Sequence, residues 1–141
     1  MAAVFPNGAR VEMIRIARPT RRLEEVVAFY RDGLGLPVIG EFREHAGYDG
    51  VMLGLPGRDL HLEFTHDAHG TPGDAPSRDN LLVLYLPDEA ALERFRAALT
   101  ALGHAPVEPE NPYWYGKSLS FEDPDGWRVV LFDQTKKEAA D

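Results

Sequence analysis

The sequence consists of two halves that carry the same order of predicted elements, and this internal repeat constrains the fold more than any other feature. In each half a strand pattern precedes an amphipathic helix pattern, and three shorter strand patterns follow. A segment rich in Gly, Pro, Asp and Ser, residues 67–79, separates the halves and has no apolar periodicity. We therefore expect one domain over residues 1–141, built from module one at 9–66 and module two at 80–134.

The clearest local signal is a hairpin at the end of the second half. Residues 118–121 alternate polar and apolar side chains, and residues 127–132 are rich in strand-forming Trp, Val, Leu and Phe. Between them, the Asp-Pro-Asp-Gly segment at 123–126 has the residue types of a tight turn. The second strand of this hairpin could carry an inward carboxylate that binds a metal, but Val130 occupies its middle.

The first half begins with a weak alternation over residues 11–18, which places Ile14 and Ile16 on one face, as in a strand covered on one side. Thr20 has the position of an N-cap, and a helix pattern ends at two glycines. The apolar stripe of this helix consists of Leu23, Val26, Val27 and Tyr30. The strand patterns that follow lie at 38–42, 51–55 and 59–65.

The second half opens with a strand pattern at 81–86. Asp88 is placed to cap the next helix, and Gly103 to end it. The predicted buried stripe of this helix consists of Leu92, Phe95, Leu99 and Leu102. A short strand at 104–107 and a rigid aromatic loop at 109–116 then lead into the hairpin.

Composition limits the functions that fit this chain. The formal net charge of −8 disfavours nucleic-acid binding, which depends largely on Lys and Arg contacts to phosphate. The absence of Cys excludes a disulfide framework, a thiolate metal site and a Cys nucleophile. The apolar runs are too short to span a bilayer, and the first residues lack a secretory signal pattern. We therefore expect a cytoplasmic protein with no nucleic-acid or membrane partner.

Several motifs together resemble the vicinal oxygen chelate superfamily. They are the two β-α-β-β-β halves, the Ala-Phe-Tyr helix at 28–30 followed by Gly-Leu-Gly-Leu at 33–36, the strand at 80–86 and the Asp-Pro-Asp-Gly hairpin. This superfamily includes glyoxalase I, extradiol dioxygenases, fosfomycin-resistance thiol transferases and bleomycin-resistance proteins. The resemblance implies an α+β fold in which two modules form a curved, cup-shaped mixed sheet with the helices on the outer face. It also implies a homodimer, and it leaves open whether the cup is built within one chain or between two.

The resemblance implies four metal-ligand positions, and they fall on Arg15, Glu63, Asn80 or Leu81, and Val130. Only Glu63 keeps a ligand of the superfamily. Because Arg15 is a permanent cation, it repels a divalent ion, so we expect no metal and no other cofactor. We expect Arg15 and Glu63 to form an ion pair instead.

Histidines leave a metal site open as an alternative. His61 shares a strand face with Glu63, and His45, His66 and His69 could join them. His61 and Glu63 are also the candidate catalytic residues, as a general acid and base. However, a Glu63 carboxylate that is paired with Arg15 would be a poor general base.

The cup would be an apolar and aromatic pocket with a few polar groups. Alternation along the strands and the position of the aromatic loop predict the residues that line it. These are Met13, Arg15, His61, Glu63, Leu81, Val83, Tyr85, Tyr113, Trp114, Tyr115, Arg128, Val130 and Phe132. The three loop aromatics could equally pack the loop against the body of the protein.

Three functions fit these expectations. The favoured one is a metal-independent binding protein of the bleomycin-resistance kind, which sequesters a small hydrophobic or aromatic compound and so confers antibiotic resistance. The second is a metal-dependent lyase, isomerase or dioxygenase of the same superfamily that uses Glu63. The third is a structural or regulatory interaction protein whose cup is filled by its own side chains. The sequence therefore favours a protein that is not an enzyme.

Overall fold

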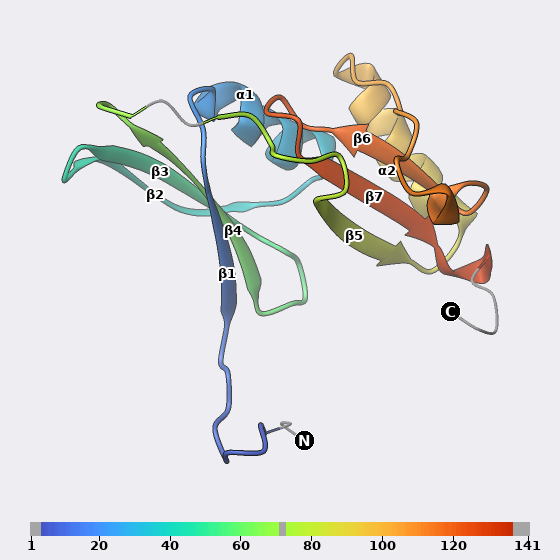
Figure 1. Cartoon of the computed structure of the whole chain (residues 1–141), viewed down its shortest axis with the longest axis horizontal. Coiled ribbons are helices and arrows are strands. Elements are labelled where there is room, and N and C mark those ends of the chain that lie inside the picture. The colour runs from blue at the N-terminus through green and yellow to red at the C-terminus, as the bar shows by residue number, and fades with distance from the viewer. Residues whose placement is uncertain (1–3, 71–72, 137–141) are drawn as a thin grey trace.

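The computed structural model describes residues 4–70 and 73–136 (Figure 1). Residues 71 and 72 of the predicted linker, and both ends of the predicted domain, lie outside this range. The first half contains β1 Ile14–Pro19, α1 Leu23–Ala28, the π-helical turn η1 Phe29–Gly33, β2 Val38–His45, β3 Tyr48–Gly54 and β4 Leu60–Asp67. The second half contains β5 Leu81–Leu86, α2 Glu89–Ala101, the 3₁₀ turn η2 Pro112–Trp114, β6 Ser118–Glu122, β7 Arg128–Asp133 and the 3₁₀ turn η3 Gln134–Lys136.

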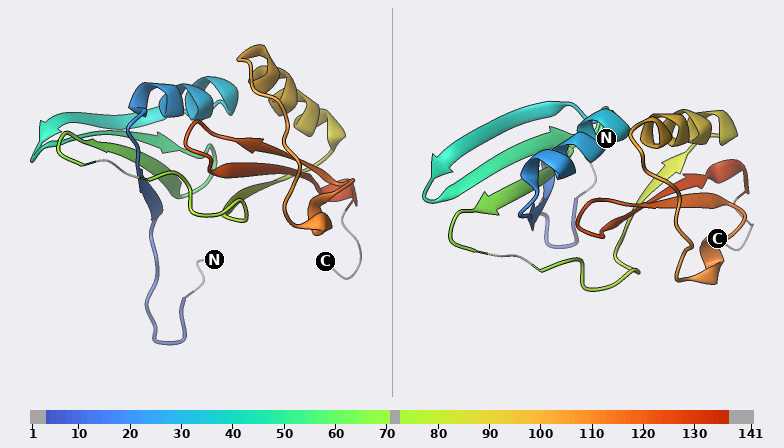
Figure 2. Two further views of the ribbon diagram at one scale, coloured as in Figure 1. Left: turned by 45° about the horizontal axis from the view of Figure 1, so that its top comes forward. Right: turned by 90° about the horizontal axis from the view of Figure 1, so that it is seen from above.

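These strands form two separate mixed sheets, with strand orders β1-β4-β3-β2 and β5-β7-β6. In each sheet the first strand of the half pairs in parallel with the last, and the remaining pairs are antiparallel. Figure 2 shows α1 and α2 on the same side of the molecule, one over each sheet, and neither sheet closes on itself. The predicted α+β fold of two tandem modules is therefore confirmed.

The core lies between each sheet and its helix because the strands alternate. In the first sheet, Leu62 and Phe64 point toward α1, and Phe64 stacks on Tyr30 at a ring distance of 4.8 Å. In the second sheet, Val129 and Leu131 are fully buried under α2. Residues of the opposite parity therefore lie on the sheet faces that the helices leave uncovered.

The ends of the helices follow the capping signals in part. The Asp88 side chain accepts a hydrogen bond from the backbone N–H of Ala91 at 2.9 Å, which confirms it as the cap of α2. The expected cap at Thr20 is wrong by two residues. Its hydroxyl accepts from the backbone N–H of Arg22, and α1 begins only at Leu23.

Two expectations for the second half are wrong. Leu102 is 45% exposed because α2 ends at Ala101, so its side chain lies beyond the packed face of the helix. The strand expected at 104–107 is reduced to one isolated bridge between Val107 and Ser120. Pro106, which has no backbone N–H, cannot extend that pairing, and the second sheet keeps three strands.

The strand β1 is less covered than its pattern indicated. Ile14 is 54% exposed and Ile16 is 36% exposed, although both lie on the face that carries Leu60 and Leu62 in β4. The physical reason is that β1 is the edge strand, while α1 packs over its neighbour β4. A strip of apolar surface therefore remains open along β1.

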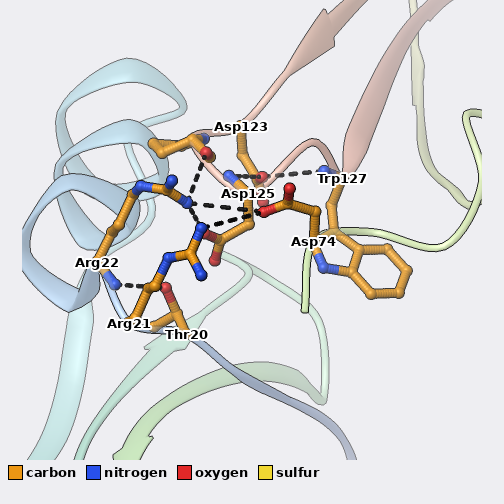
Figure 3. Close-up of polar contacts among 8 residues, drawn as sticks. Thr20, Arg21, Arg22, Asp74, Asp123, Asp125 and Trp127 are labelled. Carbon is orange, nitrogen blue, oxygen red and sulfur yellow. Dashed lines mark hydrogen bonds and ion pairs between the residues drawn. The ribbon is translucent and has the colours of Figure 1, made fainter. Parts of the chain in front are cut away.

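Polar contacts from η1, and from Arg22 just before α1, to the β6–β7 turn hold the two halves together. The Tyr30 hydroxyl donates to Asp123 at 2.7 Å, and the other carboxylate oxygen of Asp123 accepts from the backbone N–H groups of Asp125 and Trp127. Burial, and then the neighbouring Asp123 carboxylate, raise the pKa of Tyr30, while burial raises the pKa of Asp123. Figure 3 shows Arg22 beside this turn, where it pairs with Asp125 at 2.9 Å.

A cleft of about 620 Å³ opens beside this junction and is lined mainly by charged side chains. Many of these charges are already paired, such as Arg22 with Asp125 and Arg78 with Glu110 at 3.3 Å. We therefore regard this cleft as part of the junction between the halves.

Among the described residues, no helix is long and apolar enough to cross a membrane.

Candidate functional site

The uncovered face of the first sheet carries three polar side chains at neighbouring positions, which we call the polar triad: Arg15, His61 and Glu63. Arg15 in β1 lies opposite His61 in the parallel ladder, and Glu63 is two residues further along β4. The Arg15 guanidinium lies 3.8 Å from the Glu63 carboxylate, so the expected ion pair is present. Met13, expected beside them, precedes β1 and is partly exposed.

The polar triad is poorly satisfied by the protein itself. The Glu63 side chain is only 16% exposed, yet its contact with Arg15 is longer than a hydrogen bond. Among the described residues it has no other polar partner. The Nδ1 atom of His61 is buried and also has no hydrogen-bond partner among those residues. Buried polar groups are normally hydrogen-bonded, so the Glu63 carboxylate, which is still partly exposed, is the group of this face that an external partner would satisfy.

Three glycines leave room for large apolar side chains beside the polar triad. A Cβ built on Gly50 would lie 2.3 Å from the Phe42 ring, and one on Gly40 would lie 3.0 Å from the end of Met52. Similarly, a Cβ built on Gly54, which lies opposite His61, would lie 3.3 Å from the Ile39 side chain. These side chains form an apolar floor that we did not predict, because it depends on how β2 and β3 pair. The only signal in the sequence was the spacing of the glycines.

The uncovered face of the second sheet is aromatic. The register pairs Leu81 with Arg128, Val83 with Val130, and Tyr85 with Phe132, so the six residues that alternation placed on one face do share it. Tyr85 is 55% exposed, and its ring centre lies 5.1 Å from that of Phe132. By contrast, Arg128, Val130 and Phe132 are almost completely buried.

The aromatic loop covers part of this face. Trp114 packs edge-on against Phe132 at 5.8 Å, whereas Tyr113 and Tyr115 are exposed. The indole N–H of Trp114 is buried and has no hydrogen-bond partner in the described part of the chain. A half-open pocket of about 170 Å³ lies between the loop and the start of β6, next to Trp114 and Ser120. Trp114 therefore packs the loop onto the sheet, while the two tyrosines remain accessible.

Arg128 is held by the protein. It donates to the Glu122 carboxylate at 3.0 Å and to the backbone carbonyl of Glu108 at 2.7 Å, and its side chain is 5% exposed. These bonds attach the segment before the aromatic loop to the final hairpin. Arg128, expected to contact a ligand, is therefore buried, and its guanidinium is bonded to the protein itself.

The side chains at the four expected metal positions do not fit a divalent ion. Arg15 brings a positive charge to the first, Val130 is a fully buried apolar side chain at the fourth, and Leu81 or Asn80 stands at the third. Glu63 alone is an anionic oxygen donor. Within residues 4–70 and 73–136, no three His, Cys, Asp or Glu side chains gather as a metal site would require. His45, His66 and His69 therefore do not complete one with His61.

Comparison with known proteins agrees with this fold. Residues 14–65 match the YycE-like N-terminal domain, and residues 79–133 match the YycE-like C-terminal domain. The uncharacterised protein YycE of Bacillus subtilis is 50% identical over 127 residues, which cover 90% of this chain and 91% of the relative. A crystal structure of a YycE protein of unknown function from Bacillus subtilis gives a TM-score of 0.87 at 45% identity, with 99% of this chain and 100% of that chain covered.

More distant solved structures share the fold. A trypanothione-dependent glyoxalase I of Leishmania major has a TM-score of 0.66 at 20% identity, with 89% of this chain and 88% of that chain covered. TnmS3, an antibiotic binding protein of Streptomyces sp. CB03234, has a TM-score of 0.63 at 22% identity, with 88% and 96% covered. The chain therefore belongs to the YycE-like family, and its fold is that of the vicinal oxygen chelate superfamily, which contains glyoxalases and the fosfomycin- and bleomycin-resistance proteins.

Proposed function

We propose that this protein binds a small aromatic or hydrophobic molecule on the uncovered faces of its sheets, and that binding requires no divalent metal. The observation that carries the proposal is the position of Arg15. Its permanent positive charge lies 3.8 Å from Glu63, at the place where the superfamily resemblance implies a metal ligand. A cation held there favours sequestration of a compound over metal-assisted chemistry.

The aromatic side chains support an aromatic ligand. Tyr85 presents an exposed ring that packs against the buried ring of Phe132, and the exposed Tyr113 and Tyr115 of the aromatic loop add further aromatic surface. The apolar floor of Phe42, Met52 and Ile39 adds hydrophobic surface beside the polar triad. Binding of an antibiotic is the form of this function that we favour, as TnmS3 shares the fold and is an antibiotic binding protein.

We propose a homodimer as the working assembly. The apolar side chains of Ile14 and Ile16 are exposed along the free edge of β1, where a second copy could cover them. The dimer is thus the second part of the proposed function.

An NMR binding experiment tests the proposed ligand class. The chain contains two tryptophans, Trp114 and Trp127, so two indole N–H signals are expected, and the Trp127→Phe variant identifies the signal of Trp114. We expect fused-ring aromatic compounds, added in the presence of EDTA, to shift the Trp114 signal with Kd values below about 1 mM. Such shifts occurring only after Zn²⁺ or Ni²⁺ is added would favour the metal-dependent enzyme. If no compound shifts the signal under either condition, the third function is favoured, that of a structural or regulatory interaction protein whose cup is filled by its own side chains.

A further inference from the structure

The charges of the polar triad cancel, and this limits the polar group that a ligand can place there. Arg15 contributes one positive charge and Glu63 one negative charge at 3.8 Å. An anionic group near the pair is attracted by Arg15 and repelled by Glu63 at nearly the same distance, and a cationic group meets the reverse. A ligand charge would therefore gain little and would still lose its hydration.

The same pair offers a donor beside an acceptor. The Arg15 guanidinium has N–H groups that Glu63 does not engage at hydrogen-bond distance, and the Glu63 carboxylate accepts no hydrogen bond from any described residue. The two groups are close enough for one small group to contact both. Because Glu63 is mostly buried, a hydrogen bond supplied by a ligand would replace one that the protein does not provide.

We propose that the polar end of the ligand is a neutral group that carries a hydrogen-bond donor next to an acceptor, such as a carboxamide. Its oxygen accepts from Arg15 and its N–H donates to Glu63. This inference rests on the proposed function and specifies the ligand class of the same site.

Three probes that share one ring system test the proposal: 2-naphthamide, 2-naphthoate and 2-naphthylmethylammonium. Their Kd values are measured by NMR titration of the full chain at pH 7 in EDTA. We expect the neutral amide to bind about 10-fold or more tightly than either charged probe. In Glu63→Gln the site becomes positive and 2-naphthoate should bind tightest of the three; in Arg15→Gln it becomes negative and the ammonium probe should bind tightest.

Glu41→Gln is the matched control, because Glu41 lies opposite Val51 on the helix-covered face of the same sheet. This variant should keep the wild-type order of affinities. A charged probe that equals or exceeds the amide in the wild-type protein overturns the inference but leaves the proposed function standing. An order that stays unchanged in both Glu63→Gln and Arg15→Gln also overturns it. If none of the three probes binds, the result contradicts the proposed function itself, and with it the inference about the polar group.

Discussion

Arg15 is the residue that distinguishes this chain most clearly from a metal-binding protein of the same fold. The guanidinium cannot lose its proton at ordinary pH, so no change of conditions turns it into a metal ligand. Its partner Glu63 keeps the carboxylate that such a site would use, at 3.8 Å. The same two side chains account for the absence of a fitting donor set and for the neutral polar group proposed in the ligand.

Asp123 provides a pH test at the same scale. Because burial raises its pKa, the folded protein binds more protons than the unfolded chain between the ordinary Asp pKa of about 3.9 and the higher folded value. The contribution of Asp123 to the free energy of unfolding therefore decreases as the pH rises through this interval. We expect Asp123→Asn to remove this decrease, measured as the wild-type minus variant difference in urea unfolding from pH 3.5 to 7, with Asp79→Asn on the exposed surface as control. A difference that does not change with pH would contradict the assignment.

At the scale of elements, local chemistry predicted most of what the structure contains. The Asp-Pro-Asp-Gly turn forms with Gly126 at φ 90°, Asp88 caps α2, and alternation placed Leu81 and Tyr85 on the correct face. The expected strand at 104–107 was wrong because a proline interrupts it. The packing of Phe42 over Gly50 depends on the register and bulges of the β2–β3 hairpin, which no alternation pattern shows. The cover over Val130 depends on partners distant in the sequence.

The cap of α2 can be tested by itself. Asp88→Ala removes the side-chain acceptor for the Ala91 N–H, so we expect a loss of about 1 kcal/mol in the free energy of unfolding. Asp88→Asn should remain within a few tenths of a kcal/mol of the wild type, because Asn accepts the same bond. Chemical unfolding followed by circular dichroism measures both. Equal losses in the two variants would show that the charge, and not the cap, is what matters.

At the scale of the whole molecule, the exposed edge of β1 leads to a prediction about assembly. We expect the wild-type protein to sediment at twice the 15.7 kDa mass of one chain. The double variant Ile14→Lys, Ile16→Lys should sediment as a monomer, because two buried charges would oppose the apolar contact. Leu102→Lys is the control, since Leu102 is a similarly exposed apolar residue at the end of α2. A wild-type monomer, or a dimer that both variants leave intact, would contradict this role for β1.

The most direct test of the account is a metal-binding measurement on three proteins: the wild type, Glu63→Gln and Arg15→His. Each is dialysed against Zn²⁺ or Ni²⁺ and analysed for retained ion per chain. We predict no stoichiometric retention by the wild type, and a gain in Arg15→His, where an imidazole replaces the cation beside Glu63 and His61. An ion held stoichiometrically by the wild type and lost in Glu63→Gln would contradict the claim that Arg15 takes the place of a metal.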